Sequence, residues 1–135
     1  MRTVSSQRGF TLVEILIVLV ILGILFATFG TKIFAQGERA KADITRMKLQ
    51  EIKSAVNEFR FRYNKVPRSL EDLYSCTEVT GQGCQPLTSK DDLVDAWGTP
   101  LEYETRGNTF RIRSLGADGR SGGEGVNFDI FEDGP

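Results

Sequence analysis

The chain has 135 residues, 40% of them hydrophobic, with 17 Lys and Arg against 18 Asp and Glu. This length allows one membrane segment and one small domain, because single domains usually need roughly 50 to 200 residues. The balanced charge, without a clustered basic face, argues against a nucleic-acid partner. The chain has no His, and no motif places a carboxylate pair or an activated Cys, so the sequence does not predict an enzyme.

An apolar stretch from Phe10 to Phe29 follows a leader, residues 1–9, whose only charged residues are Arg2 and Arg8. The stretch of 20 residues is long enough, at ~1.5 Å per residue, to cross a bilayer core of ~30 Å. Because basic residues before an apolar span stay in the cytoplasm, we expect a cytoplasmic N-terminus and a domain on the outer side of the membrane.

Glu14 is the one charged residue inside this stretch. A carboxylate that faces lipid there costs on the order of 2 to 3 kcal/mol, which predicts a specific partner; a plain anchor whose Glu reaches toward the interface is the alternative. A secretory signal cleaved after the stretch is disfavoured, because residues 25–30 read LFATFG and are bulky where small residues are needed. An uncleaved anchor and a signal cut before the stretch remain.

The hexapeptide GFTLVE, with Glu14 as the fifth residue after Gly9, resembles the prepilin signal of the type IV pilin and pseudopilin family. The resemblance implies that a membrane prepilin peptidase cuts between Gly9 and Phe10 and methylates the new amine of Phe10. It also implies that Glu14 pairs with the Phe10 amine of a neighbouring subunit during filament assembly, which relieves two charges that are costly in hydrocarbon. Family members commonly carry Pro just after the stretch, where this chain has Gly30, so local melting of the helix there stays open.

Residues 32–64 continue the helix of residues 10–31 as an amphipathic half. One stripe contains Ile44, Ile52, Ala55, Val56, Phe59 and Tyr63, whereas Arg46, Gln50, Lys53, Asn57 and Arg60 oppose it and Lys48 interrupts it. The stripe predicts that this half covers a sheet, within one helix of about 50 residues that Asn64 and Pro67 end. Phe61 lies outside the stripe, as a surface position or a subunit contact.

Residues 65–94 are predicted to form a variable loop region. Ser69 is expected to cap a short helix together with Asp72, and Ser89 with Asp92 repeats this pattern.

Cys76 and Cys84 lie within this region, in a segment rich in Ser, Thr and Gly. On the outer side of the membrane thiols oxidise readily, which favours a disulfide over two idle thiols. The spacing, the absence of a second Cys pair and the absence of His do not support a zinc site or a CxxC redox motif.

Residues 95–135 are predicted to contain an antiparallel sheet and a glycine-rich loop. The DAWGTP turn leads into a strand in which apolar and acidic residues alternate, and the RGN turn leads into a strand that alternates with Arg. The inward residues of this hairpin would be Leu101, Tyr103, Phe110 and Ile112. Trp97, in the first turn, is expected to lie in the core or to cover the helix.

The segments DAWGTPLEYE and SLGADGRSGGEG and the Asp-Ile pair near the end of the chain look like those of the major pseudopilins of type II secretion. This resemblance implies an α+β, pilin-like fold in which a long N-terminal helical spine packs its C-terminal half on a small antiparallel sheet. It also implies a homo-oligomeric periplasmic filament, assembled from the inner membrane by dedicated machinery together with minor pseudopilins.

Residues 115–129 read LGADGRSGGEGVNFD, and taken alone they are compatible with a disordered polar tail or with a metal site. The related pseudopilins bind calcium in this loop. The resemblance therefore assigns Ca²⁺ to the carboxylates of Asp118 and of Glu124 or Asp129 and to the carbonyl of Leu115, all of them the oxygen ligands that calcium takes. The spacing does not fit an EF-hand, and the acids do not fit a phosphate loop.

The main interpretation is a structural subunit that polymerises into a periplasmic pseudopilus for protein export. A type IV pilus subunit is the alternative within the same class. A monomeric, membrane-anchored, calcium-dependent binding module is the alternative from a different class.

Overall fold

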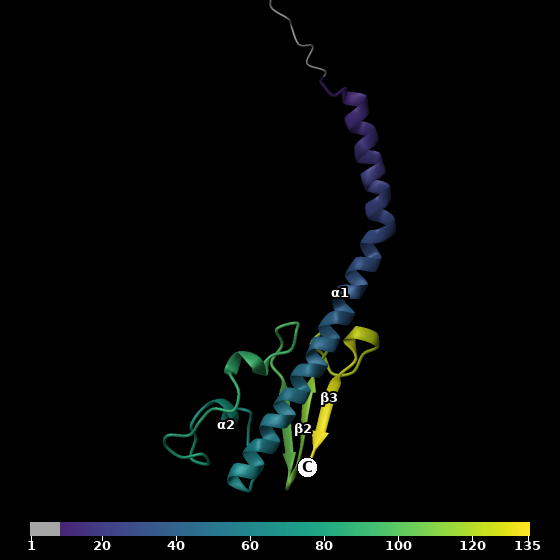
Figure 1. Cartoon of the computed structure of the whole chain (residues 1–135). Coiled ribbons are helices and arrows are strands. Elements are labelled where there is room, and N and C mark those ends of the chain that lie inside the picture. Colours follow the sequence, from purple (N-terminus) through teal and green to yellow (C-terminus); the bar gives the residue numbers. More distant parts are fainter. Residues whose placement is uncertain (1–8) are drawn as a thin grey trace, which may run out of the picture. The chain divides into compact units, whose positions relative to one another are not determined.

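The computed structural model describes residues 9–135, so the predictions for residues 1–8 of the leader lie outside the described part. The chain divides into two compact units, Met1–Gly37 and Glu38–Pro135, and helix α1, Leu12–Tyr63, contributes to both. The remaining elements belong to the second unit (Figure 1): α2 (Glu71–Tyr74), the 3-10 helix η1 (Lys90–Leu93), β1 (Glu102–Arg106), β2 (Thr109–Ser114), the 3-10 helix η2 (Gly125–Asn127) and β3 (Ile130–Gly134).

Helix α1 begins at Leu12 because Thr11 caps it. The side-chain oxygen of Thr11 accepts a hydrogen bond from the backbone N–H of Glu14 at 3.2 Å, which satisfies one of the free donors of the first turn. Farther along the apolar part, the hydroxyl of Thr28 donates to the carbonyl of Ile24 at 3.1 Å. Such a bond satisfies a polar group within the helix itself, as a segment in lipid requires.

The C-terminal end of α1 lies where the sequence predicts it. Asn64 has a φ of 54° and its N–H donates to the carbonyl of Arg60 at 2.8 Å, the left-handed ending for which Asn is suited. The hydroxyl of Tyr103 on β1 donates to the carbonyl of Pro67 at 3.0 Å, and burial raises the pKa of this tyrosine. The chain after α1 is thereby attached to the sheet.

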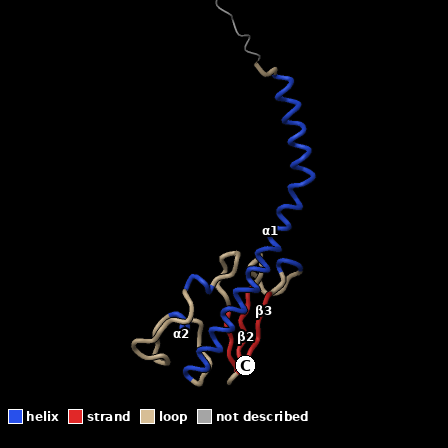
Figure 2. The backbone as a smooth tube through the Cα atoms, viewed as in Figure 1, coloured by secondary structure: helices blue, strands red, loops and turns tan. Residues whose placement is uncertain are grey.

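The three strands form one antiparallel sheet in the order β1-β2-β3 (Figure 2). In the register, Tyr103 lies opposite Ile112, and Ile112 lies opposite Glu132. The hairpin of β1 and β2 confirms the predicted alternation, with Phe110 and Ile112 buried. The sequence pattern does not predict β3, whose last three residues are Glu132, Asp133 and Gly134, all of types that are depleted in strands.

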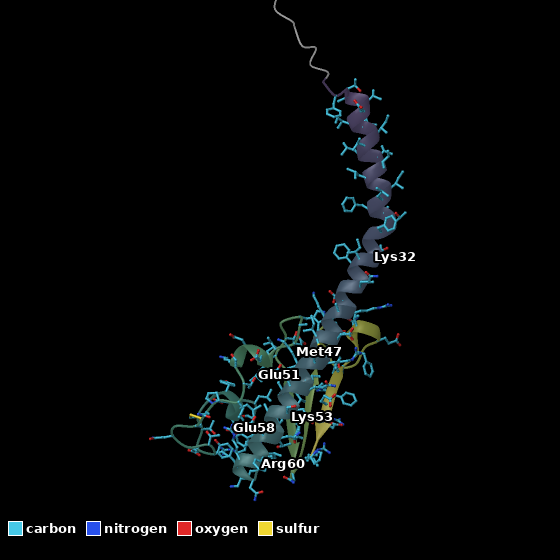
Figure 3. The ribbon with its side chains drawn as sticks, in the orientation of Figure 1. Lys32, Met47, Glu51, Lys53, Glu58 and Arg60 are labelled. Carbon is cyan, nitrogen blue, oxygen red and sulfur yellow. A yellow bond between two sulfur atoms is a disulfide. The ribbon has the colours of Figure 1, made fainter. Side chains whose placement is uncertain are left out.

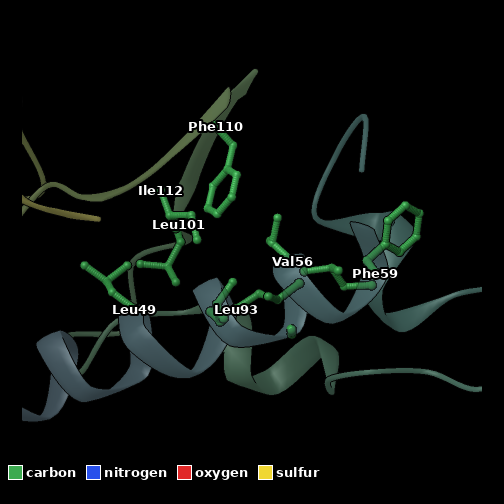
Figure 4. Packing of buried hydrophobic residues seen from close by; sticks show 10 residues of the cluster. Leu49, Val56, Phe59, Leu93, Leu101, Phe110 and Ile112 are labelled. Carbon is green, nitrogen blue, oxygen red and sulfur yellow. The ribbon is translucent and has the colours of Figure 1, made fainter. Parts of the chain in front are cut away.

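The core lies between the sheet and one face of α1 (Figure 4). The buried residues of α1 are Ala42, Thr45, Leu49, Ile52, Ala55, Val56 and Phe59. The prediction that Ile44 belongs to this face is wrong, because its side chain is 44% exposed. Thr45 and Leu49 set the face instead, and Ile44, one residue before Thr45, points about 100° away from it. Phe61 is exposed, as its place outside the stripe predicts.

The two expected helix caps of residues 65–94 have different outcomes. Ser89 and Asp92 form the predicted capping box on η1. The prediction for Ser69 is wrong: α2 begins after Leu70 without a side-chain cap, and the carboxylate of Asp72 instead accepts from the backbone N–H of Arg68 at 2.8 Å. Asp72 is buried, and the hydrogen bond from the N–H of Arg68 satisfies a carboxylate that would otherwise lack a partner there.

Three hydrogen bonds attach the turn before β1 to α1. Thr45 accepts from the N–H of Ala96 at 3.1 Å, and Lys48 donates to the carbonyl of Val94 at 3.0 Å. The indole N–H of Trp97 donates to Glu38 at 2.6 Å. Lys48 interrupts the apolar stripe because its ammonium group makes a contact at the edge of the core.

Candidate functional site

The apolar part of α1 exposes its side chains on all sides (Figure 3). Leu12 is 85% exposed, Leu19 is 63% exposed and Phe26 is 76% exposed. By length and composition this helix could cross a membrane, and none of the most apolar stretch of 18 residues is buried in the structure. Soluble monomeric proteins rarely expose so large an apolar surface to water, so this surface needs a lipid or protein environment.

Glu14 lies in the first turn of this apolar helix. Within residues 9–135 its carboxylate has no ion-pair partner. Gly9 and Phe10 precede the helix, and both are exposed. The peptide bond at which cleavage is predicted is therefore accessible in the structure. Cleavage would create a new amine on Phe10, just before the first helical turn, which contains Glu14.

The glycine-rich loop between β2 and β3 folds closely around Asn127. A side chain on Gly116 would come within 2.8 Å of the backbone of Asn127, and one on Gly123 would come within 2.5 Å of it. The N–H of Ala117 donates to the carbonyl of Val126 at 2.9 Å. Both glycines also have positive φ angles, 71° and 106°, so only glycine permits this close approach of two backbone segments.

The predicted calcium ligands lie within this loop but in different surroundings. Asp118 is exposed and accepts from the N–H of Arg120 at 3.0 Å, and Glu124 is exposed at the start of η2. Asp129 has a side chain that is 13% exposed and accepts from the N–H of Gly122 at 3.1 Å. The oxygen donors suit calcium by type. In the described part of the chain, however, no group of three or more Asp, Glu, Cys or His side chains is arranged to hold a metal ion.

Cys76 and Cys84 form a disulfide, with an S–S distance of 2.06 Å. This confirms the preference for a disulfide over two free thiols. The bridge closes the exposed loop after α2, and Leu87 beyond it donates to the carbonyl of Leu73 at 2.8 Å, which attaches the end of the loop to a buried residue of α2.

Two residues at these sites have contacts that the sequence patterns above do not predict. Thr11 could have been found from the pattern Thr-x-x-Glu at residues 11–14, which is the start signal of a capped helix. Arg113 is one of the Arg residues that alternate with the apolar residues of β2, and it contacts Glu102 on β1 and Asp129 at the end of the glycine-rich loop. Those contacts depend on strand register, which a sequence pattern does not specify.

Two family models match the chain. The model described as Type II secretion system (T2SS), protein G matches residues 32–133, and the Prokaryotic N-terminal methylation motif matches residues 4–29. The second match covers the proposed cleavage point and Glu14.

Curated proteins with the name Type II secretion system core protein G are similar over nearly the whole chain. The protein of Pseudomonas aeruginosa is 34% identical over 135 residues, covering 93% of this chain and 94% of the relative. That of Xanthomonas campestris pv. campestris is 30% identical over 128 residues, covering 93% and 90%. That of Vibrio cholerae is 27% identical over 148 residues, covering 96% and 94%. With its long N-terminal helix and three-stranded antiparallel sheet, the chain belongs to the type II secretion system protein G family.

Proposed function

We propose that this chain is the major structural subunit of a periplasmic pseudopilus that drives protein export by type II secretion. The observation that supports this most directly is the apolar half of α1, whose side chains are exposed on every side around a single carboxylate. The inner membrane covers this surface before assembly, and the same surface of other copies covers it in the filament. The proposed function is thus structural.

The proposed route begins in the inner membrane, with the N-terminus in the cytoplasm and the second unit in the periplasm. A prepilin peptidase cuts between Gly9 and Phe10 and methylates the Phe10 amine. Inner-membrane assembly machinery and minor pseudopilins then take the subunit into the filament. The match to the N-terminal methylation motif supports the processing step, and the exposure of both residues is compatible with it.

Glu14 is the proposed docking charge for the next subunit. The carboxylate and a neighbouring ammonium are each costly alone in hydrocarbon, and pairing relieves both costs. Since one carboxylate is fixed in the first helical turn, pairing with one amine would fix the axial position of each new subunit.

Calcium in the glycine-rich loop is a separate proposal, supported by the oxygen donors of Leu115, Asp118, Glu124 and Asp129.

The experiment that tests this function compares E14Q with E51Q in secretion and filament-assembly assays. Glu51 lies on the same helix, is exposed and has no ion pair within residues 9–135, so its substitution removes a carboxylate of the second unit only. E14Q should abolish filaments and secretion while leaving the protein in the membrane, and E51Q should retain both. Normal filaments and secretion in E14Q would contradict the pairing.

A further inference from the structure

Arg113 on β2 connects the sheet to the glycine-rich loop. On one side, its Nε donates to Oε2 of Glu102 on β1 at 2.9 Å, and its Nη2 donates to the same oxygen. On the other side, its Nη1 donates to the hydroxyl of Ser121 at 3.4 Å and lies 3.6 Å from Oδ2 of Asp129. One guanidinium therefore contacts two carboxylates that are far apart in the sequence.

Asp129 in turn closes the loop on itself. Its Oδ1 accepts from the N–H of Gly122 at 3.1 Å, and its Oδ2 accepts from the hydroxyl of Ser121 at 3.5 Å. Ser121 and Gly122 lie in the middle of the loop, and Asp129 lies at its end, next to β3. These bonds depend on a charged carboxylate in a sheltered position, and such a charge is costly unless a cation accompanies it.

We propose that Arg113 is the cation that orders the glycine-rich loop of this protein when no metal is bound. The loop is rich in glycine, whose ordering entropy is large, and the described side chains do not form a ready metal cluster. A cation supplied by the chain itself, 3.6 Å from the carboxylate of Asp129, compensates the charge of that residue. The same contact makes Arg113 a competitor of any divalent cation for the carboxylate of Asp129.

The test is amide hydrogen exchange of the full-length chain in detergent micelles with an excess of chelator. R113Q should speed exchange at residues 118–125 by about three- to tenfold, the effect of losing one partly buried ion pair with its hydrogen bonds. Exchange in the hairpin of β1 and β2, measured in the same sample, reports whether the domain stays folded.

Two matched controls separate this role from general stability and from loop charge. E102Q removes the other partner of Arg113 and leaves Asp129 beside the guanidinium, so loop exchange should stay within twofold of the wild type. R120Q removes an exposed Arg of the same loop whose side chain has no hydrogen bond or ion pair within residues 9–135, and it should also leave exchange unchanged.

D129N completes a double-mutant cycle with R113Q. If the two side chains act through their contact, the double variant should exchange no faster than the faster single variant. The proposal would be overturned if R113Q exchanged at the wild-type rate. It would also be overturned if the effects of R113Q and D129N on the exchange rate multiplied in the double variant, or if E102Q and R120Q accelerated exchange as much as R113Q does. Should R113Q fail to fold, D129N keeps the proposal falsifiable: wild-type exchange of its loop in chelator would overturn the proposal.

Discussion

The indole N–H of Trp97 donates to Oε2 of Glu38 at 2.6 Å, across 59 positions of the sequence. Glu38 is the first residue of the second unit, and Lys41 donates to its other carboxylate oxygen at 3.1 Å. The only tryptophan of the chain therefore ties the turn before β1 to α1 at the point where the second unit begins. It also provides a fluorescence signal for this contact.

This contact predicts a pH-dependent stability. The hydrogen bond from Trp97, and then that from Lys41, lowers the pKa of Glu38 from its ordinary value of 4.5. Because the folded pKa is the lower one, the contribution of Glu38 is complete above 4.5 and disappears as the pH falls through the folded pKa. E38Q should therefore lower the melting temperature at neutral pH, and the difference from the wild type should shrink below that range.

Melting curves followed by Trp97 fluorescence over the acid range give this measurement. E51Q is the matched control, since Glu51 is exposed and has no ion pair within residues 9–135, and its melting curve should follow the wild type at every pH. A difference between E38Q and the wild type that stays constant with pH would contradict the assigned cause.

Substitution of the buried Asp95 should reduce stability more than substitution of Glu38. It is 3% exposed; its Oδ1 accepts from the N–H groups of Trp97 at 3.0 Å and Thr99 at 2.9 Å, and its Oδ2 accepts from the hydroxyl of Ser114 at 2.7 Å. D95A would leave these three donors without their acceptor and should lower the free energy of unfolding by about 2 to 4 kcal/mol. Urea unfolding measures this.

D91A is the control for D95A, because Asp91 is an exposed acid close by in the sequence. Its free energy of unfolding should stay within about 0.5 kcal/mol of the wild type. Equal losses in D95A and D91A would mean that the Asp95 contacts contribute nothing specific.

The calcium proposal predicts a change in thermal stability. A cation that binds only the folded chain raises the melting temperature, so chelator should lower it and added calcium should restore it in the wild type. R113Q removes the competitor for Asp129, so its calcium-dependent shift should exceed that of R120Q. Melting curves that calcium leaves unchanged in all three proteins would remove the calcium site and leave the metal-free role of Arg113 intact.

Processing predicts a defined mature N-terminus. Intact-mass spectrometry of the protein from its host membrane should show a chain that begins at Phe10 and carries one added methyl group. G9V should accumulate as the uncleaved precursor, because a branched side chain replaces the glycine at the cut. A wild-type chain that keeps Met1 would contradict processing and favour a plain membrane anchor.

The sequence by itself determined the features that depend on local patterns. The run from Phe10 to Phe29 is too apolar for anything but a membrane or a protein interior, and the helical period carries on to Tyr63, where Asn64 permits the left-handed ending. The capping box at Ser89 and the hairpin that turns at Gly107 also follow from short segments.

Only the tertiary structure decided which residues of those elements meet. Thr45 lies in the buried face in place of Ile44 because the turn at Ala96 supplies a donor for its hydroxyl. The carboxylate of Asp72 accepts a hydrogen bond from the N–H of Arg68 and does not take part in a helix cap with Ser69. Arg113 contacts Asp129 because β3 pairs with β2 in one particular register. Burial and register arise from contacts across long sequence separations, and these contacts outweigh the small local preferences that a sequence pattern expresses.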